Sequence, residues 1–149
     1  MDKLLLKFSP SELQRIGPLI KVMIGHTKPE LEEAKSLGFE FPQPRPFHGL
    51  IDTGAAVTII NPELAKTYKL VRTGRAPIKA AGHTAVYDEF AASISFPERN
   101  LKEFEILRIV ACPLASAEMS CLIGRDILRH WELNYNGDSG EVTIRDLRI

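Results

Sequence analysis

Short apolar runs separated by glycine, proline and polar residues dominate the sequence from residue 47 to its end. These runs are rich in β-branched and aromatic residues, and several alternate apolar with polar side chains, which favours strands over helices. Many short strands with few helices are typical of a small barrel or sandwich, not of a parallel doubly wound sheet. We therefore predict an all-β fold, with strands at residues 57–60, 76–81, 85–96, 104–111 and 141–149.

The first 46 residues have a different pattern, in which helix-capping signals flank a single strand-like run. Residues 9–12 carry the serine, proline and glutamate of a helix N-terminus, and the Gly-Pro pair at 17–18 ends that helix. Residues 27–30 repeat the capping signal before a second short helix, and residues 19–24 are predicted to form a strand between the two. Residues 41–46 alternate proline with other residues, which predicts an extended connector.

The chain has the size and composition of one globular domain. It has 149 residues and 16.6 kDa, with 44% apolar and 26% charged residues, so two independent cores would each be marginal. We expect residues 1–46 to be an N-terminal extension with the first strand and short helices. Residues 47–149 are expected to form the core, within one structural domain overall.

Charge and cysteine content exclude several classes of function. Nineteen Lys and Arg balance nineteen Asp and Glu, so no overall field favours nucleic acid as a partner. The apolar patch at residues 4–6 is too short for a signal-peptide core, and no run is long enough to cross a membrane. Cys112 and Cys121 fit neither a CxxC pair nor a zinc site and are expected to be reduced and packed. We expect a soluble, cytoplasmic protein without a membrane partner.

One carboxylate stands where a charge is unusual. Asp52 follows two apolar residues, Leu50 and Ile51, and precedes Thr53 and Gly54. The apolar pair predicts a buried strand, the glycine permits a sharp turn, and the threonine hydroxyl can bond locally and stiffen the loop. The pattern predicts a carboxylate fixed at a strand end. A turn or capping aspartate is the usual alternative for Asp before Thr-Gly.

A second segment further along the chain makes the catalytic interpretation of Asp52 the stronger one. Residues 121–128 place two apolar residues and Gly124 before Arg125, Asp126 and a short amphipathic stretch. Together the two segments resemble the retropepsin-like aspartic proteases, the single-domain enzymes of retroviruses and their cellular and bacterial relatives. The resemblance covers residues 47–149 and rests on pattern. It implies a closed β-barrel with short helices that forms a symmetric homodimer.

The resemblance also implies roles for particular residues. Asp52 would be the catalytic aspartate. The active-site loop would be completed by Thr53, Gly54 and Ala55. The segment behind that loop would be Leu122, Ile123, Gly124, Arg125 and Asp126, with Gly124 opening a short C-terminal helix and Arg125 bracing the loop. The tip of a flap over the substrate would be Ala80, Ala81, Gly82, His83 and Thr84, and residues 141–149 would be a terminal strand that ties two subunits together.

The sequence departs from the family pattern at two places. Ala56 stands where retroviral members carry an acidic residue that anchors the arginine corresponding to Arg125, so Arg125 needs another partner here. The segment before Phe47 is longer than in the family and partly helical, which leaves open whether residues 1–8 supply an interface strand.

Hydrolysis of a peptide bond by this chemistry needs two carboxyls, one ionised and one protonated. The chain also has an Asp-Ser-Gly tripeptide, the other form of the family's motif, at Asp138. It follows the polar pair Asn136 and Gly137 and has no backing segment after it. We predict a hairpin turn at residues 136–140 instead. The pair of carboxyls must then come from two copies of Asp52 in a homodimer.

The resulting hypothesis is an aspartic endopeptidase that cleaves an extended polypeptide and needs no cofactor. A non-catalytic dimeric peptide-binding module with the same fold is the first alternative, and an unrelated small barrel that binds a hydrophobic ligand is the second. No metal site is expected from the histidines, which are far apart in the sequence: His26, His48, His83 and His130.

Overall fold

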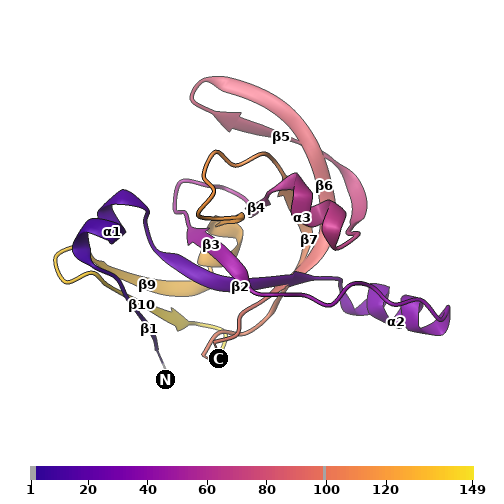
Figure 1. The fold of residues 1–149 in the computed structure, drawn as a ribbon, viewed down its shortest axis with the longest axis horizontal. Helices are drawn as coiled ribbons and strands as arrows, with labels where there is room; N and C mark the ends of the chain where they lie inside the picture. Colours follow the sequence, from indigo (N-terminus) through magenta and orange to yellow (C-terminus); the bar gives the residue numbers. More distant parts are fainter. Residues whose placement is uncertain (1–2, 99) are drawn as a thin grey trace.

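The computed structural model describes residues 3–98 and 100–149, and Figure 1 shows their arrangement. Within these residues the chain forms ten strands and four short helices, so the fold is dominated by β-structure, as predicted. The strands are β1 (Leu4–Lys7), β2 (Leu19–Gly25), β3 (Phe47–Ile51), β4 (Ile59–Ile60), β5 (Val71–Ala80), β6 (His83–Ser95), β7 (Phe104–Ala111), β8 (Cys121–Ile123), β9 (Trp131–Asn136) and β10 (Glu141–Asp146). The helices are α1 (Pro10–Arg15), α2 (Lys28–Ser36), α3 (Pro62–Thr67) and α4 (Arg125–Leu128).

Two sheets make up the fold. The larger one has seven strands in the order β2-β3-β8-β4-β7-β6-β5, and β6 also pairs with β2. The hydrogen-bonded neighbours therefore run from β2 around to β6 and back to β2, with β5 continuing outward from β6. The smaller sheet has the order β1-β10-β9, and all of its pairings are antiparallel.

The strand that precedes Asp52 has a neighbouring strand on each side in the larger sheet. Strand β3 pairs antiparallel with β2 and parallel with β8, with Ile51 opposite Ile123. Strand β8 in turn pairs antiparallel with β4. Isoleucines and valines from these strands are fully or almost fully buried, and they include Val22, Ile24, Ile60 and Ile123. The core thus fixes the position at which β3 ends.

Strand β2 belongs to the N-terminal 46 residues, yet it is integral to the larger sheet through its pairings with β3 and β6. Helix α2 lies in the long connection between β2 and β3 and projects from the body of the molecule (Figure 1). Both helices of this segment begin where the capping signals predicted. Ser9 accepts a hydrogen bond from the Glu12 amide, and Thr27 and Glu30 form a capping box.

Several predicted boundaries differ from the structure. The strand expected at 57–60 is only β4, because the Thr58 amide donates to the Asp126 carboxylate and only the Thr58 carbonyl, which accepts from the Val110 amide, bonds to a neighbouring strand. The run expected at 141–149 ends as a strand at Asp146. The short helix expected after Gly124 covers Arg125–Leu128, and Trp131 begins β9. Within residues 1–8, β1 pairs with β10 of the same chain, while Met1 and Asp2 lie outside the described residues.

Candidate active site

Asp52 is the first residue beyond β3, and its backbone is tied to β8. Its amide donates a hydrogen bond of 3.0 Å to the carbonyl of Ile123, which continues the parallel pairing by one residue. Ile51, directly before it, is almost completely buried, whereas Asp52 itself is half-buried. A buried strand and a hydrogen bond to a neighbouring strand therefore hold a solvent-accessible carboxylate.

The loop after β3 folds back onto this carboxylate. The Gly54 amide donates to Asp52 Oδ1 at 2.8 Å, and the Ala55 amide donates to the Asp52 carbonyl at 3.2 Å. A Cβ atom on Gly54 would lie 3.1 Å from Asp52 Oδ1, closer than most side chains pack. Glycine at this position therefore allows a backbone N–H to approach the carboxylate and fix its orientation.

Two of the residues predicted to lie behind the loop, Arg125 and Gly124, contact the segment after Asp52. The Arg125 amide donates to the Ala55 carbonyl at 2.8 Å, and Arg125 Nη1 donates to the Thr53 carbonyl at 2.7 Å. The partner that Arg125 finds in place of an acidic side chain at Ala56 is thus a backbone carbonyl of the loop itself. A Cβ atom on Gly124 would lie 2.5 Å from backbone atoms of Val57, so only glycine fits there.

Thr58 is a further supporting residue, which the sequence analysis did not single out. It is completely buried, and its hydroxyl donates to Asp126 Oδ1 at 2.7 Å while its amide donates to Asp126 Oδ2 at 3.0 Å. The same hydroxyl accepts a hydrogen bond of 3.2 Å from the Gly124 amide. The sequence signal that could have identified Thr58 is its position as a polar residue directly before the two apolar residues of β4. Thr58 and Asp126 together join the end of the Asp52 loop to the start of α4.

The β5–β6 hairpin forms the opposite wall of a cleft of about 550 Å³ that includes Asp52. In the view of Figure 1 the hairpin curves over β3 and β4. Its wall of the cleft consists of Pro77, Ile78 and Lys79, while the floor includes Ala55 and Leu122. The cleft is thus lined mainly by apolar residues, with a carboxylate at its base.

The predicted flap residues occupy the end of this hairpin. Ala81 and Gly82 form its two-residue turn, both with positive φ, and His83 and Thr84 begin β6 as exposed residues. Ala80 ends β5, and its side chain lies outside the part that the structure describes. Among the described residues, those that line the cleft lie just before the turn, at positions that the sequence analysis did not select.

Asp138 lies in the smaller sheet, in the turn between β9 and β10. Asn136 Oδ1 accepts hydrogen bonds from the amides of Asp138 and Ser139, at 3.1 and 3.0 Å. This confirms the predicted hairpin turn. The Asp-Ser-Gly tripeptide therefore belongs to a different structural setting from the loop of Asp52.

The cysteines and histidines take no part in a metal centre in the described residues. No group of three or more His, Cys, Asp or Glu side chains in residues 3–98 and 100–149 has the geometry to hold a metal ion. Cys112 and Cys121 are both free, and burial, with a smaller contribution from Asp126, raises the pKa of the Cys121 thiol far above its usual range. In the same residues no helix has the length and apolar character needed to cross a membrane.

Comparisons with known proteins identify the family of the chain. A family described as "gag-polyprotein putative aspartyl protease" matches residues 43–130, which include both Asp52 and the segment behind its loop. Among solved structures, a retropepsin-like aspartic protease from Rickettsia conorii is similar, with 16% sequence identity and a TM-score of 0.42 over 85% of this chain and 91% of that chain. A search of curated proteins found no match. Because the family match spans more than half of the sequence, the chain belongs to this family of retroviral-type aspartyl proteases.

Proposed function

We propose that the protein is an aspartic endopeptidase whose active site contains Asp52 from each of two identical subunits. The observation that carries this proposal is the loop of Asp52. Its carboxylate is held by the Gly54 amide at 2.8 Å, at the base of a cleft roofed by the β5–β6 hairpin. Because a chain of the aspartyl protease family with one such loop provides only one of the two carboxyls, a second subunit must provide the other.

The chemistry follows from bringing two carboxyls together. Two ionised carboxylates about 3 Å apart would repel by roughly 5 kcal/mol at an effective dielectric constant of about 20, so the pair retains one proton. The ionised Asp52 takes a proton from the attacking water, and the protonated one polarises the carbonyl of the scissile bond. Water is the nucleophile, so the reaction needs neither a metal nor a cofactor.

The supporting residues keep the two carboxyls in place. Thr53, Gly54 and Ala55 set the shape of the loop, while residues 122–126 hold it from behind through Arg125 and Asp126. The flap residues 80–84 would close over a polypeptide bound in extended form, and backbone hydrogen bonds along the hairpin would hold that substrate like an added strand. Residues 1–46 and 47–149 act as one domain, since β2 pairs with both β3 and β6. These pairings also favour a closed barrel.

The proposal is tested with Asp52→Asn on a denatured protein substrate between pH 4 and 8. Asparagine keeps the size of the side chain but cannot act as the base, so we expect cleavage to fall by at least about a thousandfold while the fold is retained. Asp138→Asn is the matched control, because it makes the same change in an exposed turn, and it should cleave like the wild type. Equal activity of the two variants would rule out Asp52 as the catalytic group.

Subunit mixing tests the dimer. An excess of Asp52→Asn subunits should inhibit the wild type, since mixed dimers contain only one competent carboxyl, and sedimentation should give twice the mass of one chain. An excess of Asp138→Asn subunits, which carry an intact Asp52, should not inhibit. A monomer that cleaves would contradict the shared active site. A dimer that binds an extended peptide but never cuts it would favour a non-catalytic peptide-binding module.

A further inference from the structure

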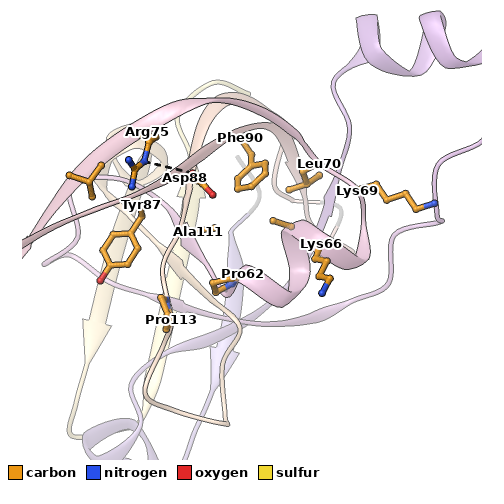
Figure 2. A pocket seen from close by; sticks show the side chains of 12 residues that line it. Pro62, Lys66, Lys69, Leu70, Arg75, Tyr87, Asp88, Phe90, Ala111 and Pro113 are labelled. Atoms are coloured by element: carbon orange, nitrogen blue, oxygen red, sulfur yellow. Dashed lines mark ion pairs between the residues drawn. The ribbon is translucent and has the colours of Figure 1, made fainter.

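A second concave surface lies outside the cleft of Asp52, between helix α3 and the base of the β5–β6 hairpin (Figure 2). It has a volume of about 560 Å³, and we call it the α3 groove. Helix α3 and the residues after it contribute Pro62, Lys66 and Lys69, and the hairpin contributes Arg75 and Tyr87. None of these residues lines the cleft that contains Asp52.

The floor of the α3 groove is apolar. Ala65, Leu70 and Ala111 line it from below and are themselves buried, and Phe90 from β6 is half-buried beside them. At the hairpin side, Val86 is 50% exposed. An apolar floor with an exposed valine at its edge can bury an apolar side chain of a bound chain, which is favourable at roughly 25 cal/mol per Å².

The rim of the α3 groove is positively charged. Lys66 and Lys69 are exposed and form no ion pair with any residue that the structure describes. The one acidic residue in the lining, Asp88, is already bound by Arg72 at 3.0 Å and lies 4.0 Å from Arg75. Figure 2 shows the pair of Arg75 and Asp88 at one end of the groove and the two lysines at the other. The groove therefore complements an acidic ligand.

The α3 groove and the cleft are lined by neighbouring residues of β5. Pro77 lines the cleft and Arg75 lines the groove, and two residues of a strand span about 7 Å. A polypeptide that leaves the cleft along the hairpin reaches the groove after only a few residues. This short distance, together with the positive charge of the groove, points to the substrate itself as the occupant.

We propose that the α3 groove is a secondary binding site for an acidic segment of the polypeptide substrate, with one apolar side chain seated on its floor. The proposal rests on the proposed protease function and adds a preference for substrates that carry acidic residues beyond the scissile region. Binding at the groove raises the local concentration of the scissile bond at the cleft, so it lowers KM and leaves kcat unchanged.

Two peptides with the same cleavage sequence test the proposal. The short peptide fills only the cleft, and the long one adds a flexible spacer and an acidic segment with one leucine. The acidic extension should lower the KM of the wild type about tenfold, and Lys66→Glu with Lys69→Glu should abolish that gain. Lys21→Glu with Lys35→Glu makes the same change of charge at exposed positions on β2 and α2 and should retain the gain. All forms should cleave the short peptide equally.

Several outcomes would overturn the inference. One is equal KM values of the two peptides for the wild type. Another is an equal decrease in KM from a basic extension. A third is loss of the dimer in the variant of Lys66 and Lys69, because that would make the groove a contact between subunits. Cleavage of the short peptide by the wild type depends only on the proposed function. A failure of the protease proposal and a failure of the secondary site are therefore distinguishable.

Discussion

Thr58 connects the end of the Asp52 loop to the segment that begins at Gly124, because its hydroxyl donates to Asp126 and accepts from the Gly124 amide. Valine has nearly the same shape but would leave the buried Gly124 amide without its acceptor and Asp126 Oδ1 without one of its donors. We expect Thr58→Val to lower the free energy of unfolding by about 2 kcal/mol, measured by urea titration. Thr58→Ser keeps the hydroxyl and should cost about half as much. Equal losses for the two variants would show that packing, not hydrogen bonding, determines the role of Thr58.

Gly124 tests how tightly the supporting segment is packed against the loop. A Cβ atom at this position would overlap backbone atoms of Val57 and Thr58, which cannot move aside as a flexible side chain would. Gly124→Ala should therefore destabilise the protein by about 3 kcal/mol and reduce cleavage. Gly137→Ala, in the exposed turn of the smaller sheet, is the control and should change the thermal midpoint little. A stable, active Gly124→Ala variant would contradict this packing.

Part of the site was predictable at this scale and part was not. Asp52, Gly54 and Gly124 carry local signals, because a charge after a buried strand and a glycine at a turn are visible in the sequence. The partner of Arg125 is a backbone carbonyl, and no side-chain pattern encodes it. The bond from Thr58 to Asp126 joins residues far apart in the chain, so only the fold could reveal it.

Among the elements, the turn of the β5–β6 hairpin contains a local conflict. Both turn residues have positive φ, at 49° for Ala81 and 76° for Gly82, yet alanine disfavours this conformation. Ala81→Asn should therefore raise the free energy of unfolding by about 0.5 to 1 kcal/mol, since asparagine followed by glycine suits this turn. Ala117→Asn, in an exposed loop without positive φ, should have no effect. A destabilised Ala81→Asn variant would contradict the turn geometry.

The helices were easier to predict than the strands for a physical reason. Capping residues at Ser9 and Thr27 act within one turn of the helix, so the sequence contains the whole signal. The limits of β4 and β10 depend on which backbone groups have partners in distant strands. The pairing of β2 with β6 and of β1 with β10 likewise depends on contacts across most of the chain.

At the scale of the whole molecule, Asp146 and Arg148 connect the two sheets. Asp146 ends β10 in the smaller sheet and accepts a hydrogen bond of 2.9 Å from the amide of Lys102, just before β7 of the larger sheet. Arg148 binds the Asp146 carboxylate at 2.8 Å and also donates to the carbonyls of Lys102 and Glu103. Its guanidinium lies 3.5 Å from the centre of the Phe104 ring. The carboxylate is almost completely buried.

Because of this connection, the folded state should lose stability at acid pH. Burial alone would raise the pKa of the Asp146 carboxyl, but the hydrogen bonds from the Arg148 side chain and from the amides of Lys102 and Arg148, together with the Arg148 charge, outweigh it and lower the pKa to about 2. In the unfolded chain the carboxyl titrates near its usual value of about 3.9. The folded state is therefore favoured by about 2 kcal/mol above pH 4, and this contribution is lost as the pH falls from about 4 to about 2.

Asp146→Asn removes the titrating group while keeping its shape. At pH 7 we expect the variant to unfold with a free energy about 2 kcal/mol below that of the wild type, measured by urea titration. The difference should shrink between pH 4 and pH 2, because the wild type then protonates Asp146 and loses the same contribution. Asp138→Asn, in the exposed turn, should follow the wild type at every pH. If the difference in the free energy of unfolding between the wild type and Asp146→Asn stays constant down to pH 2, the charge of the Asp146 carboxylate does not stabilise the contact between the sheets.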